Sequence, residues 1–193
     1  MLYPNEKVSR RNLLKVLASS SLLLSNVRLL GQDPVPRIRI VLTYAVGLWY
    51  FNPVGLFVEK GHTVEWLATR WGPTVTAFHP SNNNQELRIP EAAEPFDSGV
   101  LAREDTFRWT FNVEGTYDYF SKNHLGMGVV GRIIVGRPGG PGEMPPRYGG
   151  AQGRAPIYPR AMPVFEFLDS QEIVRQKTVS FPTDRLGHGY PEY

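Results

Sequence analysis

Two predicted β-strands joined by a glycine-rich loop, within residues 114–135, constrain the fold of this chain more than any other stretch. Polar and apolar side chains alternate over residues 116–120, and residues 132–135 close the stretch with an apolar run. Both patterns are typical of β-strands, and the glycines between them favour a tight bend. The stretch therefore predicts a strand, a loop that could carry a site, and a second strand.

The chain around this stretch also predicts β-structure. Residues 37–44 alternate polar and apolar side chains, as a half-buried strand does. Residues 50–66 contain two short strand patterns with a turn at Lys60–Gly61. Short strands separated by turn signals at this spacing predict an all-β sandwich over residues 33–137.

The loop resembles the copper-binding loop of the cupredoxins, the plastocyanin, pseudoazurin and halocyanin type, whose pattern is G-x-Y-x-Y-x-C-x-x-H-x4-M-x-G. Placed on this pattern without a gap, Ser121 takes the position of the ligand Cys, His124 that of a ligand His, and Val129 that of the axial Met. Residues 72–80 resemble the segment that supplies the other His, and Pro73 takes its position. The resemblance implies a Greek-key β-sandwich that works outside the cytoplasm, near membrane electron transfer.

The residues at these positions predict that the blue-copper centre is lost. A blue-copper site needs a thiolate with two imidazoles and a weak axial ligand, and this chain has no Cys. A serine hydroxyl, a proline and a valine do not replace those donors. We therefore expect no cofactor, with Pro73, Ser121, His124 and Val129 as vestigial positions. The strongest remaining metal candidates are His79, His124 and Met127, which would form only a weak site.

Two broad function classes are disfavoured by the sequence. A formal net charge of +3, with scattered basic residues, gives no footprint for nucleic acid. Ser121 and His124 lie too close in sequence on one loop to indicate a catalytic triad, and no G-x-S-x-G elbow surrounds the serine. We expect a protein that is not an enzyme.

The N-terminal segment, residues 1–32, is predicted to be a signal or a retained membrane anchor. Residues 9–15 read S-R-R-N-L-L-K and precede an apolar run, which resembles a twin-arginine export signal. The run is shorter than a bilayer span and contains Arg28, so we expect residues 8–30 to contact the membrane surface if they are retained. This predicts a periplasmic, membrane-associated protein exported by the twin-arginine route.

The C-terminal segment, residues 138–193, begins with a Pro- and Gly-rich run and is predicted to be an extended tail. Its composition indicates no second core, so the sandwich is expected to be complete at Val135 and to fold without the tail. One short helix is predicted at residues 170–176, with Asp169 or Ser170 as its N-cap. Such a tail would bind partner proteins through apolar anchors, for which the candidates are Tyr148, Ile157, Tyr158, Phe165, Phe167 and Phe181.

These expectations combine into one functional prediction with one alternative. The chain is predicted to be a copper-free structural or accessory subunit of a membrane-associated electron-transfer complex, respiratory or photosynthetic, on its periplasmic side. The alternative is a protein that binds a metal weakly, without a blue-copper centre, or that still transfers electrons.

Overall fold

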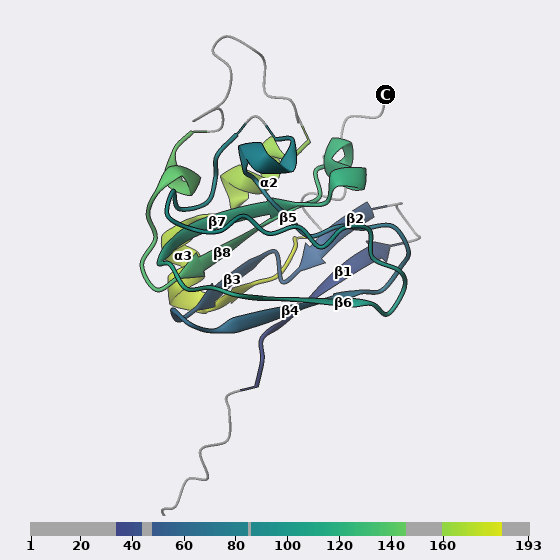
Figure 1. Ribbon diagram of the computed structural model, residues 1–193, viewed down its shortest axis with the longest axis horizontal. Coiled ribbons are helices and arrows are strands. Elements are labelled where there is room, and N and C mark those ends of the chain that lie inside the picture. The colour runs from purple at the N-terminus through teal and green to yellow at the C-terminus, as the bar shows by residue number, and fades with distance from the viewer. Residues whose placement is uncertain (1–33, 44–47, 85, 146–159, 183–193) are drawn as a thin grey trace, which may run out of the picture. The chain divides into compact units, whose positions relative to one another are not determined.

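The computed structural model describes residues 34–43, 48–84, 86–145 and 160–182 (Figure 1). The described residues from Val35 on form one compact unit. The predicted signal or anchor, residues 1–32, lies outside the described residues. Within the part of the chain that is described, no helix is long and apolar enough to cross a membrane.

Two β-sheets form the body of the protein. The first has four strands in the order β2-β1-β4-β6, and the second has five in the order β5-β7-β8-β3-β9. The strands of the first sheet are β1 (Arg37–Thr43), β2 (Leu48–Asn52), β4 (Thr63–Ala68) and β6 (Thr106–Thr110). Those of the second are β3 (Gly55–Val58), β5 (Thr76–Ala77), β7 (Gly115–Phe120), β8 (Val130–Val135) and β9 (Thr178–Val179). The predicted all-β sandwich is confirmed.

The strands of each sheet pair with their neighbours in a defined direction and register. In the first sheet β1 runs parallel to β4, with Ile38 opposite Trp66, and antiparallel to β2. In the second sheet β7 pairs antiparallel with β8, so that Asp118 lies opposite Arg132. Because successive side chains point to opposite faces, every second residue of each strand enters the space between the sheets.

Trp66 lies at the centre of the core between the two sheets. Its side chain is fully buried, and its ring packs against several aromatic rings at centroid distances of 5.6 to 6.3 Å. These rings belong to Phe96, Phe107, Phe111 and Tyr119. Aromatic side chains bury large apolar areas, so this cluster holds the two sheets together.

A second apolar core lies on the other face of the second sheet, where the sequence indicated none. The chain after β8 forms α2 (Met162–Phe167) and α3 (Ser170–Gln176) and ends in β9, which pairs with β3. Helix α2 contacts β8, and α3 contacts β3 and β8, beside which Figure 1 shows it. The side chains that this extension buries against the sheet are Ala161, Val164, Leu168, Ile173, Val179 and Phe181.

The described part of the C-terminal segment therefore differs from the expected coreless tail. Its two helices are short, six and seven residues, so neither provides the long periodic pattern by which sequence reasoning finds an amphipathic helix. The predicted helix at residues 170–176 is confirmed as α3, and the Asp169 carboxylate accepts the Glu172 N–H at 2.7 Å as its N-cap.

A buried ionic cluster joins the extension to the sandwich. Asp118 is fully buried on β7, and its carboxylate accepts hydrogen bonds from Arg88 Nε at 2.8 Å and from Arg132 Nε at 2.8 Å. Both guanidinium groups also donate to the carbonyl oxygen of Gly142, each at 3.0 Å. Arg132 further donates to the carbonyl oxygen of Leu168 at 2.7 Å. One sandwich carboxylate thus orients two arginines whose remaining donors bind the backbone of the extension.

Candidate functional site

The loop between β7 and β8 forms a short 3-10 helix, η2 (Lys122–Met127), with Ser121 at its N-cap and Gly128 at its C-cap. Gly128 has φ 78°, a left-handed conformation that favours glycine, and its N–H bonds the carbonyl oxygens of His124 and Leu125. A Cβ at Gly128 would also lie 2.4 Å from the carbonyl oxygen of Arg160. Both constraints fix the loop in the conformation that presents His124.

Ser121 is the polar centre of this loop. Its side chain is completely buried, and its Oγ accepts the Thr74 N–H at 3.0 Å and lies 2.9 Å from His124 Nδ1. Because the buried hydroxyl proton needs an acceptor and Nδ1 lies within hydrogen-bond distance, we assign this proton to the bond with Nδ1. The neutral imidazole then carries its own proton on Nε2.

A chain of hydrogen bonds continues from Thr74 to the surface. Thr74 Oγ1 accepts the Lys122 N–H at 2.8 Å and lies 2.9 Å from Thr76 Oγ1, which donates to Asp97 at 2.9 Å. The Asp97 carboxylate also pairs with the Lys122 ammonium. Burial raises the pKa of Asp97, but the hydrogen bonds from Lys122 and Thr76 outweigh burial and lower that pKa overall. Hydrogen bonds thus join the loop at residues 72–76 to the loop at residues 121–129.

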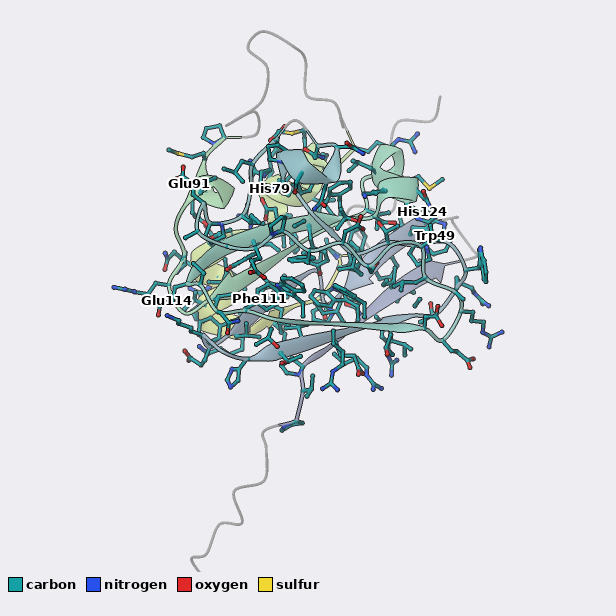
Figure 2. All side chains as sticks on the ribbon, viewed as in Figure 1. Trp49, His79, Glu91, Phe111, Glu114 and His124 are labelled. Atoms are coloured by element: carbon teal, nitrogen blue, oxygen red, sulfur yellow. The ribbon has the colours of Figure 1, made fainter. Side chains whose placement is uncertain are left out.

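The His124 imidazole is half-buried and stacked on the indole of Trp49 from β2, as Figure 2 shows. The ring centroids are 4.2 Å apart and the planes are inclined by 25°. Burial lowers the pKa of His124, because the imidazolium loses hydration there. The preceding loop residue, Asn123, donates from Nδ2 to the carbonyl oxygen of Gly72 at 2.8 Å.

Val129 and Pro73 complete the four positions predicted from the resemblance. Val129 is 1% exposed and packs in the core between the sheets, and its carbonyl oxygen accepts the Ser121 N–H at 3.1 Å. Pro73 is buried, and its neighbour Thr74 bonds Ser121 directly. The structure therefore brings these positions together at one end of the sandwich. Apart from the His124 imidazole, their side chains offer only a hydroxyl and two hydrocarbon groups.

The other metal candidates are divided between two places. His79 caps the short helix η1 (Pro80–Asn82), where its Nδ1 accepts the Ser81 N–H at 3.1 Å. Figure 2 shows His79 apart from His124. Met127 ends η2 and its side chain is 43% exposed. Within the described ranges, no three His, Cys, Asp or Glu residues lie close enough to hold a metal ion.

The candidate partner anchors in the described part of the chain contact the protein's own second core. Phe181 is 6% exposed and stacks on Tyr50 at a centroid distance of 4.6 Å. Phe165 packs edge-on against Phe78 at 5.8 Å, and Phe167 is partly buried in the same cluster. The remaining candidates, Tyr148, Ile157 and Tyr158, lie outside the described residues.

Comparisons with known proteins agree with this architecture. Residues 39–136 match the family model of copper-binding proteins of the plastocyanin/azurin family. The chain is 28% identical over 92 residues to plastocyanin from Nostoc punctiforme. This match covers 46% of this chain and 66% of that protein. It is also 28% identical over 96 residues to plastocyanin from Scenedesmus fuscus, covering 46% of this chain and 89% of that protein. The chain therefore spans just under two thirds of the Nostoc plastocyanin.

Among solved structures, pseudoazurin from Methylobacterium extorquens AM1 is 18% identical, with a TM-score of 0.49. That match covers 70% of this chain and 100% of the pseudoazurin chain. With the family model matching half of its length, this chain belongs to the plastocyanin/azurin family of copper-binding proteins.

The donors present do not fit the copper centre that the family implies. The buried hydroxyl of Ser121 is neutral, hard and already saturated with hydrogen bonds, whereas blue copper requires a thiolate. Sequence reasoning found the four positions but missed Thr74 and Trp49, which hold Ser121 and His124. Thr74 adjoins a predicted position, but no local signal links Trp49 to a histidine so far along the chain.

The lowered pKa of the His124 imidazole predicts that the stability of the protein depends on pH. Since the folded-state pKa of His124 lies below the ordinary 6.5, the unfolded chain binds more protons just below that pH. The free energy of unfolding should therefore be greatest above about pH 6.5 and fall as the pH is lowered through the folded pKa. Urea unfolding at a series of pH values checks this. His124→Gln should flatten the curve in that window, and an unchanged curve would contradict the assignment.

Proposed function

We propose that this chain is a copper-free, non-catalytic accessory domain of a membrane-associated electron-transfer complex, respiratory or photosynthetic, on the periplasmic side. The observation that carries the proposal is the state of Ser121. It occupies the position of the family's thiolate ligand, is fully buried, and uses its oxygen to join two loops. The fold of an electron carrier is retained while the atoms that would carry the electron are replaced.

At this end of the sandwich, hydrogen bonds link two loops that a bound metal ion would otherwise link. A metal ion would join the loop at residues 72–76 to the loop at residues 121–129 through its ligands. Here the Thr74–Ser121 and Thr74–Lys122 hydrogen bonds join the same loops, at 3.0 and 2.8 Å. Each such bond contributes about 1 kcal/mol net, and more would be lost if one partner were left buried and unsatisfied. These bonds support a domain end that would stay ordered without copper.

A non-catalytic role agrees with the chemistry of the Ser121–His124 pair. The serine oxygen has no exposed surface and is held as a hydrogen-bond acceptor by Thr74, so a substrate carbon cannot approach it. No carboxylate contacts the imidazole among the described residues, and its ring lies against Trp49. The pair is organised for stability, which supports an accessory role.

The proposed location and partners rest on the sequence and the family. Residues 9–15 resemble a twin-arginine signal, which supports export to the periplasm. Relatives in the family are named plastocyanins. Residues 8–30 would contact the membrane surface, and residues 146–159, with Tyr148, Ile157 and Tyr158, supply apolar groups for protein subunits.

The native chain is expected to show no intense visible band when titrated with Cu(II), because that band arises from a copper–thiolate bond. Absorption spectroscopy with metal analysis checks this. A variant carrying Pro73→His, Ser121→Cys and Val129→Met is the matched control, since it restores the donors without changing the loop length. An intense band with one copper per native chain would contradict the proposal.

The assembly itself is tested in detergent-solubilised membranes. The full-length chain, expressed with an affinity tag, should co-purify at fixed stoichiometry with subunits that carry redox cofactors, detected by their absorption spectra. The same chain with Arg10→Lys and Arg11→Lys should remain in the cytoplasm and recover none of them. Purification of the exported chain without cofactor-bearing subunits would overturn the accessory role.

A further inference from the structure

Three strands of the first sheet, β1, β4 and β6, have an outer face that is open to solvent. On this face Arg37 of β1 lies opposite Glu65 of β4, and Glu65 lies opposite Arg108 of β6. The side chains of Arg37 and Arg108 are each 55% exposed. The alternate residues Ile38 and Trp66 are buried in the core. Figure 1 shows β4 and β6 on the side of the sandwich opposite to α2.

Glu65 orients both arginines of this row. Its carboxylate accepts a hydrogen bond from Arg37 Nε at 2.7 Å, and its second oxygen lies 3.7 Å from Arg108 Nε. The Glu65 side chain is 15% exposed, much less than either arginine. Each guanidinium group has five N–H donors, and one carboxylate does not use all of them. Donors of both arginines therefore remain available to an acceptor outside the protein.

Arg39 adds a charge that has no counter-charge. It is exposed and follows Arg37 on the same face, about 7 Å further along β1. Its neighbours in the next row, Leu67 and Thr106, are uncharged. In the described part of the chain, no carboxylate pairs with Arg39. The face thus presents three guanidinium groups and one carboxylate.

The position of this face in the chain points to a membrane surface as its partner. Residues 8–30 are predicted to contact the membrane, and β1 begins at Arg37. Seven residues of extended chain reach at most about 25 Å, so the start of β1 stays close to a membrane that holds residues 8–30. Val35, just before β1, is 40% exposed. Phosphate groups of anionic lipids attract arginine side chains and accept their hydrogen bonds.

We infer that the outer face of β1, β4 and β6 docks on anionic phospholipid headgroups through the guanidinium groups of Arg37, Arg39 and Arg108. The inference rests on the membrane location proposed above and adds which surface of the domain faces the lipid. The attraction is electrostatic, so salt weakens it. A retained anchor raises the effective concentration of lipid at this face, so a few charges are sufficient for docking. The opposite side of the sandwich, with α2, then remains free for protein subunits.

The test uses the absence of Cys from the chain, because a single introduced thiol can then carry a dye at one chosen position. Thr110→Cys places an environment-sensitive dye on the exposed face, where Thr110 lies opposite Thr63. The full-length chain is mixed with vesicles of phosphatidylcholine, with or without phosphatidylglycerol. The dye emission should shift to the blue only on the anionic vesicles, and high salt should reverse the shift. Glu166→Cys, at an exposed position of α2, is the matched label and should report water on both vesicles.

Arg39→Gln with Arg108→Gln should lower the ratio of docked to undocked domain, read from the dye at position 110, at least about tenfold. Arg137→Gln with Arg175→Gln is the matched control, because it removes the same charge from side chains that are 89% and 75% exposed elsewhere. It should leave the shift unchanged.

Co-sedimentation with the vesicles separates the two proposals. A chain that sediments while position 110 reports water on anionic vesicles would overturn the docking face and leave the membrane location intact. A chain that sediments with neither vesicle would overturn both. Shielding of position 110 only in the complex with co-purified subunits would assign the face to a protein and overturn lipid docking.

Discussion

Asp118→Asn is expected to lower the free energy of unfolding by about 3–5 kcal/mol, the range measured when one partner of a buried ion pair is removed. The carboxylate is fully buried between Arg88 and Arg132, whose side chains are 2% and 8% exposed. Asparagine keeps the size of the side chain but removes the only carboxylate among the described residues that pairs with both buried guanidinium groups, which leaves Arg88 with the longer Glu86 pair at 3.6 Å. Urea denaturation followed by tryptophan fluorescence measures the loss.

Glu114→Gln is the matched control for this change. It also neutralises a carboxylate paired with an arginine, but the Arg137 side chain is 89% exposed and that of Glu114 is 40% exposed. A surface pair of this kind contributes about 0–1 kcal/mol, so the midpoint of unfolding should shift little. If both variants lose the same small amount, the buried cluster does not stabilise the attachment of the extension.

A chain that ends at Pro145 is expected to lose cooperative folding, whereas one that ends at Pro182 should fold as the native protein does. The shorter chain lacks five large side chains that are buried in the second core. Burial of each contributes about 1.5–3 kcal/mol to the free energy of unfolding. These side chains are Val164, Leu168, Ile173, Val179 and Phe181. The sum of their contributions, about 7.5–15 kcal/mol, is comparable with the roughly 5–15 kcal/mol that stabilises a typical domain. Removing them also exposes Phe78, Phe120 and Ile134 to water.

Truncation at Pro145 further removes two acceptors of Arg132, the carbonyl oxygen of Leu168 and the hydroxyl of Ser170. The measurement is the slope and midpoint of urea unfolding for both truncated chains, with dye binding to detect exposed apolar surface. If the chain ending at Pro145 unfolds cooperatively at the native midpoint, the sandwich is complete at Val135 and the extension is not part of its core.

Close approaches at two glycine residues also indicate that the extension is part of the folded domain. A Cβ at Gly55 in β3 would lie 2.8 Å from the Ile173 side chain, and one at Gly142 would lie 2.7 Å from the Thr116 carbonyl oxygen. Contacts this close require that the sandwich and the extension pack together. Extension and sandwich therefore form one folded unit.

The sequence by itself determined β1, β3, β4, β7 and β8, the site loop and the residues at its four vestigial positions, but not β2, β5 or β9. Alternation with period two identifies strands, and the loop spacing aligns Ser121, His124 and Val129 without a gap, because these are local properties of the chain. Asp169 was one of the two N-cap residues that the sequence predicted, since a cap depends on a few neighbouring residues, and the structure selects it over Ser170.

Only the tertiary structure decided what covers the outer face of the second sheet. Alternation places Asp118 and Arg132 on that face but does not say whether the face meets water or another element. The two residues pair across neighbouring strands and are then buried by short helices that have no long period of their own. Likewise, Trp49 meets His124 because β2 lies beside η2 in space, and contacts between distant segments leave no local pattern in a sequence.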